Sequence, residues 1–347
     1  MKNKKFNIML LLFTLALVLF FTLKDNLSGV IKELSNINIF LFIIAILVYM
    51  LSLVFKSISL HIFIKEKDKN KKYKFKNTLS LTLIGQFLNG ITPFQSGGQP
   101  FQIYLLKKEG FRISDSSCAM IKDFMSYQIA LIIMGILALI INLKLNLVGL
   151  NWLIFIGFII NIIVLIFLFL SVFAKKSVIK LANKLIPLLV KIRVIKNDDV
   201  LRKKIMDGLN NFYEGGIELK NSKTKFFISI LTNIINLSLL YIVPFIIFKS
   251  ADFNDITILG SISLTAFVML IGNFIPIPGA TGGIEYGFIR FFGIYNIKSV
   301  LLSSCMLLWR FITYFFGMLV GFIVLFLKEG FKKNENRTFY WYISSIY

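Results

Sequence analysis

The chain has 347 residues, of which 57% are hydrophobic and 16% are charged, and its mean hydropathy is +0.79. This composition excludes a set of soluble domains and predicts an integral membrane protein. The formal net charge of +22, from 39 Lys and Arg against 17 Asp and Glu, would also suit a nucleic-acid-binding protein. The distribution of the charge along the chain has to decide between these two interpretations. Two Cys in apolar runs and a single His exclude disulfide frameworks, zinc sites and His-dependent catalytic triads.

Six apolar stretches approach the ~20 residues that a helix needs to cross a bilayer. They are residues 6–23, 37–64, 118–141, 152–173, 226–248 and 300–327. Lysines precede the first stretch, as in a secretory signal peptide, but no small-residue cleavage pattern follows it. A retained membrane anchor is therefore predicted there.

Two further apolar regions, 79–106 and 256–294, are interrupted in the middle by Pro and Gly, at residues 92–100 and 276–283. The arms of the first region have about 14 residues, and each is too short to cross a bilayer alone. Such runs break a helix and expose backbone groups, which is tolerated at membrane depth only where the backbone is buried in protein or lines a wet cavity. We therefore predict two re-entrant helical hairpins.

The positive charges give the orientation. With both hairpins re-entrant and the N-terminus inside, the cytoplasmic segments hold 30 of the 39 Lys and Arg, and the external segments hold five. If residues 79–106 crossed once, the segment 174–225 with its 13 cations would lie outside, which the positive-inside bias rejects. Both termini are therefore expected in the cytoplasm.

The two interruptions share a repeat with an offset of 185 residues, which pairs Pro93, Gly97 and Gly98 with Pro278, Gly282 and Gly283. The predicted fold is an all-α membrane protein with about six full transmembrane helices and two oppositely oriented re-entrant hairpins, the layout of inverted-repeat transporters. The alternative is that Pro and Gly merely recur in loops. One membrane domain is expected over 1–330, with halves of about 1–145 and 150–330, followed by a short cytoplasmic tail, 331–347.

The hairpin tips suit an anionic ligand. Backbone amides at the glycine pairs, and the helix N-termini that follow them, point partial positive charge at an anion. Neutral hydrogen-bonding groups accompany them at Asn89, Thr92, Gln95, Ser96, Gln99 and Thr281.

Four ionisable residues lie in apolar surroundings: Lys122, Asp123, Glu285 and Arg310. A charge in hydrocarbon costs at least ~2.5–3.5 kcal/mol on insertion scales, so such residues usually pair or line a cavity. Arg310 is expected to pair with Glu285 or Asp123. For Lys122 and Asp123 the alternative is that they snorkel to the inner interface, and Lys56 and His61 are interpreted as interface anchors.

The segment 174–225 begins with apolar residues at helical spacing among lysines. This pattern favours a basic amphipathic helix on the anionic inner leaflet, and an ordinary solvated connector is the alternative. A tRNA is a polyanion that this segment could attract, but a recognised nucleic-acid-binding fold does not fit in about 50 residues.

Three motifs resemble those of the lysylphosphatidylglycerol synthase transmembrane-region family, over about residues 1–330. They are Pro93 with Gly97-Gly98-Gln99-Pro100 and the following Tyr104-Leu105-Leu106-Lys107-Lys108; Pro276-Ile277-Pro278-Gly279 with Gly282-Gly283-Ile284-Glu285; and Leu308-Trp309-Arg310-Phe311 with Tyr314. Two positions depart from the family, which often has an acidic residue at the position of Gln99 and a glycine at that of Ala280. The first departure counts against cation or proton chemistry at Gln99.

The resemblance implies a flippase-like protein of the bacterial cell membrane that moves lipids between leaflets, commonly aminoacylated phosphatidylglycerol, as in the membrane half of the multiple peptide resistance factor. Full-length members add a soluble domain that transfers lysine from lysyl-tRNA to phosphatidylglycerol. Neither the residues after 327 nor the segment 174–225 has the 100–200 residues, roughly, of such a domain. The alternatives are a phosphatidylglycerol lysyltransferase and a membrane partner of a separately encoded synthase.

The expected partners are therefore phosphatidylglycerol or its aminoacyl derivative, a separate synthase, and a second copy in a homodimer, but not DNA. No catalytic residue, metal site or cofactor is predicted. The predicted substrate-binding residues are Asn89, Thr92, Pro93, Ser96, Gly97, Gly98, Gln99, Lys122, Asp123, Pro278, Gly279, Gly282, Gly283, Glu285, Arg310 and Tyr314.

Overall fold

The computed structural model describes residues 27–68, 72–149, 152–173, 207, 222–272, 275 and 277–330. Every regular element in these residues is a helix. The predicted span 6–23, nearly all of the connector 174–225 and the tail 331–347 lie outside the described residues.

Four described helices are long and apolar enough to cross a membrane. They are α3 (Ile39–Lys67), α6 (Ile113–Leu145), α10 (Lys223–Ser250) and the continuous helix Ser299–Lys328, which contains α13 (Ser299–Arg310), the π-helical turn η4 (Phe311–Phe316) and most of α14 (Gly317–Gly330). They coincide with four of the six predicted spans. The helix α7 (Trp152–Phe173) has the bounds of a fifth, although its apolar part, Ile154–Leu170, is shorter. The prediction of an all-α membrane protein is confirmed for the described residues.

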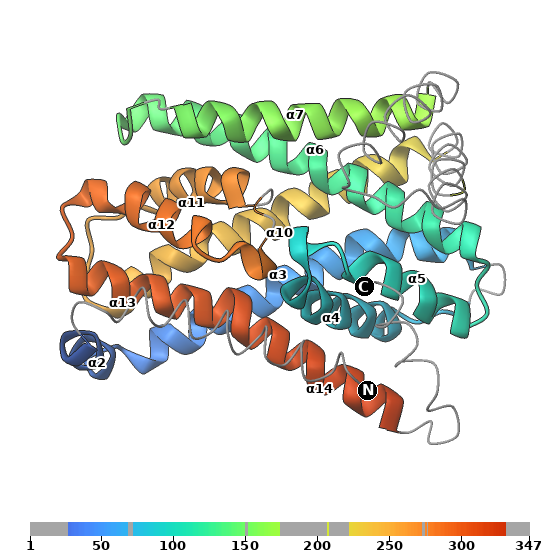
Figure 1. The fold of residues 1–347 in the computed structure, drawn as a ribbon, viewed down its shortest axis with the longest axis horizontal. Coiled ribbons are helices and arrows are strands. Elements are labelled where there is room, and N and C mark those ends of the chain that lie inside the picture. Colours follow the sequence, from blue (N-terminus) through green and yellow to red (C-terminus); the bar gives the residue numbers. More distant parts are fainter. Residues whose placement is uncertain are drawn as a thin grey trace, which may run out of the picture.

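Two pairs of shorter helices occupy the interrupted regions. The first pair is α4 (Phe75–Ile91), the turn η1 (Pro93–Gln95) and α5 (Gly98–Lys108); the second is α11 (Ile258–Gly272), the turn η2 (Pro278–Ala280) and α12 (Gly283–Phe292). Within each pair the two helices pack against each other. Figure 1 shows α4 and α5 in one half of the elongated bundle and α11 and α12 in the other half, and the turns η1 and η2 contact each other between them.

The backbone repeats at these turns. Phe94 and Gln95 have left-handed φ angles of 54° and 53°, and the residues 185 positions later, Gly279 and Ala280, have 65° and 53°. The helices that follow begin at Gly98 and Gly283, again 185 residues apart. A left-handed conformation costs a non-glycine residue about 1–2 kcal/mol, so backbone strain is concentrated where the two breaks meet.

The long helices hold the broken pairs in place. The central contact is between α3 and α10, and α10 also packs against α6 and α11, while α14 packs along α4. The short helices α2 (Leu27–Ser35) and η3 (Gly293–Tyr295) lie against α13 and α12. The ring of Phe288 on α12 stacks on Trp309 of α13, with centroids 4.9 Å apart, and on Phe292 of its own helix at 4.4 Å.

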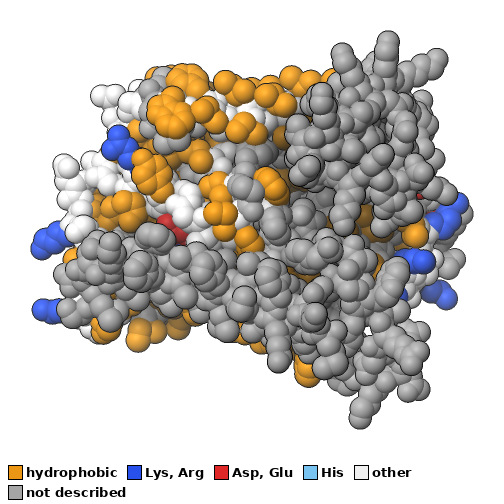
Figure 2. All heavy atoms as spheres, in the orientation of Figure 1, with side chains coloured by type: hydrophobic (Ala, Val, Ile, Leu, Met, Phe, Trp, Pro, Cys, Tyr) orange, Lys and Arg blue, Asp and Glu red, His pale blue; other side chains and the backbone are white. Residues whose placement is uncertain are grey.

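Charged side chains lie toward the two ends of the bundle. Figure 2 shows described Lys and Arg side chains at both ends of one face, with hydrophobic side chains between them. At the end where α3 stops and α6 starts, ion pairs join Lys67 to Asp115 at 3.8 Å and Lys328 to Glu109 at 2.5 Å. An apolar belt between charged ends is what a bilayer-spanning protein requires.

Candidate functional site

A buried ion pair lies beside the meeting point of the two helix breaks. Arg310, the last residue of α13, is 3% exposed, and its Nε lies 2.7 Å from Glu285 Oε1 on α12. Its Nη2 donates a hydrogen bond to the Gly279 carbonyl oxygen at 2.9 Å, and its guanidinium carbon lies 4.5 Å from the ring centroid of Tyr314. Of the two predicted partners of Arg310, the structure selects Glu285.

Directly after Arg310 the helix changes from α to π geometry, at η4. Tyr49 from α3 donates its hydroxyl proton to the carbonyl oxygen of Thr313 in this turn, at 3.0 Å. Gly317 permits the approach, because a Cβ atom there would lie 2.2 Å from the Tyr49 hydroxyl oxygen. Single π-helical turns occur frequently at functional sites, since they redirect side chains and leave backbone groups available.

Tyr314, from the same turn, joins the two halves of the chain. Its hydroxyl donates to the carbonyl oxygen of Gly90, at the end of α4, at 2.9 Å. Its ring occupies the space that a side chain on Gly279 would fill. One tyrosine therefore contacts the first helix break, the second helix break and Arg310.

Replacing Tyr314 with Phe removes this hydroxyl and leaves the buried Gly90 carbonyl without its donor. An unsatisfied buried acceptor costs about 1–3 kcal/mol, so we expect a corresponding fall in the free energy of unfolding in detergent. Phe315→Leu, on the next and less buried position, serves as the control for a general loss of aromatic packing. An unchanged melting temperature for Tyr314→Phe would contradict the assigned hydrogen bond.

The expectation that backbone amides at the glycine pairs are free to bind an anion is wrong at three positions. The amide of Gly98 donates to Asn89 Oδ1 at 2.8 Å, and the amide of Gly97 donates to Thr92 Oγ1 at 2.9 Å. The amide of Gly282 donates to Glu285 Oε2 at 2.7 Å. Side chains of the protein thus satisfy these donors, as helix caps do, and Asn89, Thr92 and Glu285 serve to shape the breaks.

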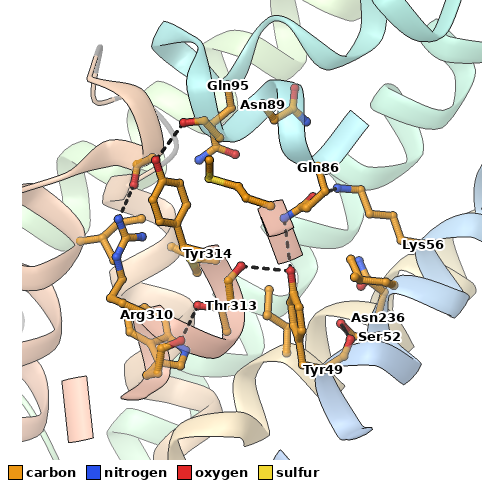
Figure 3. Close-up of a pocket in the computed structure, with 18 of the residues that line it drawn as sticks. Tyr49, Ser52, Lys56, Gln86, Asn89, Gln95, Asn236, Arg310, Thr313 and Tyr314 are labelled. Atoms are coloured by element: carbon orange, nitrogen blue, oxygen red, sulfur yellow. Dashed lines mark hydrogen bonds between the residues drawn. The ribbon is translucent and has the colours of Figure 1, made fainter. Parts of the chain in front are cut away.

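Two adjoining cavities open beside the ion pair. The smaller, of about 100 Å³, has Arg310, Tyr314 and Tyr49 in its wall, and the larger, of about 340 Å³, lies between α3, α4 and α6. The two share Lys56, Gln86, Asn89, Gln95 and Tyr127 as lining residues. Figure 3 shows Arg310 and Tyr314 on one side of the smaller cavity and Lys56, Ser52 and Tyr49 on the other.

The interpretation of Lys56 as an interface anchor is wrong, because its side chain lines both cavities. Its Nζ donates to Gln86 Oε1 at 3.4 Å within the shared wall. The missed signal is a polar stripe at helical spacing, Tyr49, Ser52, Lys56 and Ser59, which places these side chains on one face of α3. His61, the other predicted anchor, lies 2.7 Å from Thr78 Oγ1 through its Nδ1 and lines neither of the two cavities.

Lys122 and Asp123 are neighbours in sequence but have different surroundings. Lys122 is fully buried and its Nζ lies 3.3 Å from Glu66 Oε2, away from the lining of both cavities. Asp123 lines the larger cavity, and its Oδ1 accepts a hydrogen bond from Ser59 at 2.5 Å. The prediction that Lys122 binds substrate is therefore not supported by its position, because an internal ion pair occupies its ammonium group.

Replacing Lys122 with Met is expected to act on stability alone. It leaves Glu66 with Lys225, at 3.9 Å, as its remaining cation among the described residues. The loss of a charged hydrogen bond costs about 1.5–3 kcal/mol. We expect the double variant Lys122→Met with Glu66→Gln to recover most of the lost melting temperature, and a double variant no more stable than the single one would contradict the pairing.

The remaining predicted residues divide by position. Gln99 lines the larger cavity, Ser96 is exposed, Pro278 is buried, and a Cβ atom on Gly283 would overlap the side chain of Ile275. The side chain of Pro93 lies outside the described residues. Among the described residues no group of three or more His, Cys, Asp or Glu could hold a metal ion.

Comparison with known proteins gives one family match, and the matched residues include both helix breaks and the ion pair. The model of the family described as lysylphosphatidylglycerol synthase TM region matches residues 7–321. A search of curated proteins gave no match. The matched residues include both cavities, so the family assignment applies to the candidate site.

Proposed function

Because the chain belongs to the lysylphosphatidylglycerol synthase transmembrane-region family, we propose that it is a flippase-like protein. It moves an anionic or aminoacylated phospholipid, of the lysyl-phosphatidylglycerol type, between the leaflets of a bacterial cell membrane. The observation that carries the proposal is the contact between two helix breaks, from opposite halves of the bundle, beside the buried Arg310.

The proposed topology has six full spans, two oppositely oriented re-entrant hairpins and both termini in the cytoplasm. The positions of α4 with α5 and of α11 with α12 in opposite halves of the bundle support it (Figure 1). The end with Lys67, Arg112 and Lys328 is then cytoplasmic, as the positive-inside bias requires. In inverted-repeat transporters, broken helices likewise meet near the midplane and form the substrate site.

Arg310 is proposed to bind the lipid phosphate. A guanidinium has five N–H donors in a planar fork that matches phosphate oxygens. The contacts of Arg310 with described residues use Nε and one hydrogen of Nη2, which leaves Nη1 available toward the smaller cavity. Glu285 fixes the orientation of the guanidinium before the lipid arrives, so little side-chain entropy is lost on binding.

The cavities give the head group a polar route while the acyl chains stay in the bilayer. Transfer of an unsatisfied polar group into an apolar medium costs about 2–7 kcal/mol. Side chains such as Gln86, Asn89 and Gln95, which line both cavities, replace the lost water contacts. Contacts that break and re-form between η1 and η2 would open the route to one leaflet at a time.

Reconstitution tests this function directly. Phosphatidylglycerol and lysyl-phosphatidylglycerol, each labelled with a fluorophore on one acyl chain, are placed in proteoliposomes, and a membrane-impermeant reductant quenches the outer leaflet. We expect the protein to make the inner pool accessible and Arg310→Gln to suppress that movement, whereas Arg290→Gln, exposed on α12, does not. No movement of either lipid by the parent protein would reject the proposal.

The name of the family, which refers to a synthase, favours a second candidate function. In that case the protein is the membrane component of a lysyltransferase, either with activity of its own or with a separately encoded enzyme. Purified protein is incubated with lysyl-tRNA and phosphatidylglycerol, with and without cytosolic extract. Formation of lysyl-phosphatidylglycerol by the purified protein would establish the enzyme, and formation only with extract would establish the partner role.

A further inference from the structure

The larger cavity contains one cation and one anion that make no direct ion pair with each other. Lys56, on α3, and Asp123, on α6, are the two charged residues among its lining side chains. In the described part of the chain, neither residue forms an ion pair, and each is held by a neutral group. Arg310, the other charged residue near the cavities, already has Glu285 as its partner.

This separation is unusual inside an apolar helix bundle. Opposite charges attract strongly where the effective dielectric constant is low, and an isolated charge at membrane depth is costly. Two charges of opposite sign that line one cavity without a direct ion pair are therefore expected to be retained for a ligand that contacts both.

A hydrogen-bonded network fixes the carboxylate in its position. Ser59, which donates to Asp123, lies 2.7 Å from the hydroxyl oxygen of Ser229 on α10, and Asn233 Nδ2 donates to Ser59 at 2.8 Å. Ser126 closes the network with contacts of 2.6 Å to Ser229 and 3.0 Å to Asn233. Residues of three helices thus hold Asp123, while Lys56 is held by Gln86 of α4.

The rest of the lining suits a polar head group. Amide side chains, among them Asn89, Gln95 and Gln99, offer donors and acceptors without net charge. The volume of about 340 Å³ lies at the lower end of the range for small-molecule sites. It accommodates a phosphate together with a short amine, and the acyl chains would remain outside.

We propose that this cavity binds a zwitterionic phospholipid head group, with the phosphate at Lys56 and a primary ammonium at Asp123. Asp123 is then the residue that favours an ammonium-bearing lipid over a plain anionic one. The inference rests on the proposed lipid transport. It makes the larger cavity a second binding site for the head group next to Arg310, because Lys56 lines both cavities.

The test compares two lipids that differ in the ammonium group. Acyl-labelled phosphatidylethanolamine and phosphatidylglycerol are assayed in the same proteoliposomes, and the ratio of their initial rates is measured. Because only phosphatidylethanolamine offers an ammonium group for a charge-assisted hydrogen bond to Asp123, we expect the parent protein to favour it by about tenfold, equivalent to about 1.4 kcal/mol. We expect Asp123→Asn, which keeps an acceptor for Ser59, to bring the ratio near one, and Asp123→Glu to preserve the preference.

Lys56→Gln provides the matched control, because both lipids carry a phosphate. We expect Lys56→Gln to slow the movement of both lipids to a similar extent and to leave the ratio of their rates unchanged. Loss of the preference in Asp123→Asn alone would then reflect the missing carboxylate and not general damage to the cavity. A parent protein without preference, or an Asp123→Asn variant that keeps the preference, would overturn the inference. If the parent moves no lipid at all, transport fails as a function and the binding measurement alone decides the inference.

Native mass spectrometry supplies that measurement. We expect more phosphatidylethanolamine than phosphatidylglycerol to be retained by the parent protein, and equal retention by Asp123→Asn. Glycerophosphoethanolamine, which is the head group without acyl chains, is tested in the same way to distinguish a lipid from a free solute as the ligand of the cavity. Retention of this solute in place of the lipid would overturn the assignment to a lipid head group.

Discussion

Replacing Arg310 with Ala is expected to abolish lipid movement and to lower the free energy of unfolding by about 3–5 kcal/mol, the usual result of breaking a buried ion pair. Glu285, whose side chain is 12% exposed, loses the cation that lies 2.7 Å from its Oε1. The Gly279 carbonyl oxygen loses its donor at the same time. The expected measurements are a lower melting temperature in detergent and no transport in proteoliposomes.

A neutral pair separates the two effects of this substitution. The double variant Arg310→Met with Glu285→Gln removes both charges and keeps side chains of similar length, so most of the lost stability should return. Transport should not return, because no guanidinium remains to bind phosphate. A double variant that recovers both stability and transport would show that the ion pair is structural, and the phosphate site would then have to lie elsewhere.

The sequence predicted the two helix breaks well because their causes are local. Pro93 and Pro278 each interrupt the regular helix. The glycine pairs that follow mark the breaks in the sequence, but of these four glycines only Gly282 has a positive φ angle, and the other left-handed angles at the breaks lie at Phe94, Gln95, Gly279 and Ala280. The pairing of Arg310 with Glu285 was also accessible, since a buried charge needs a partner and few were available in the apolar stretches.

The larger cavity could not be predicted in the same way, because it depends on which helix face meets which neighbour. Lys122 and Asp123 are adjacent, so they point about 100° apart around α6. One meets Glu66 in an internal ion pair and the other meets the cavity. Hydropathy counts both residues alike and does not distinguish these environments.

The backbone amides show a second limit. Glycine pairs before a helix start predict free donors, and at Gly97 and Gly98 side chains from five and nine positions upstream occupy these donors. Thr92 and Asn89 were recognised as polar residues near the site, but their separation in sequence from Gly97 and Gly98 did not predict hydrogen bonds to the amides of these glycines. Only the folded break brings them together.

One added methyl group at Gly279 should disturb both the backbone and the packing. Its φ angle of 65° is unfavourable for Ala, and a Cβ atom would lie 2.4 Å from the ring of Tyr314. The backbone conformation costs about 1–2 kcal/mol, and overpacking adds about 1–3 kcal/mol. We expect Gly279→Ala to lower the melting temperature and to stop lipid movement, because Tyr314 must leave either Gly90 or Arg310.

Two other glycines separate the backbone cost from the steric cost. Gly282 also has a positive φ angle, of 90°, but no atom lies within 4 Å of an added Cβ, and Gly149 has the same open space without the unusual angle. The expected order of destabilisation is therefore Gly149→Ala, near zero, then Gly282→Ala, then Gly279→Ala. If Gly279→Ala costs no more than Gly282→Ala, the ring of Tyr314 moves aside freely, and it cannot then couple the two helix breaks to Arg310.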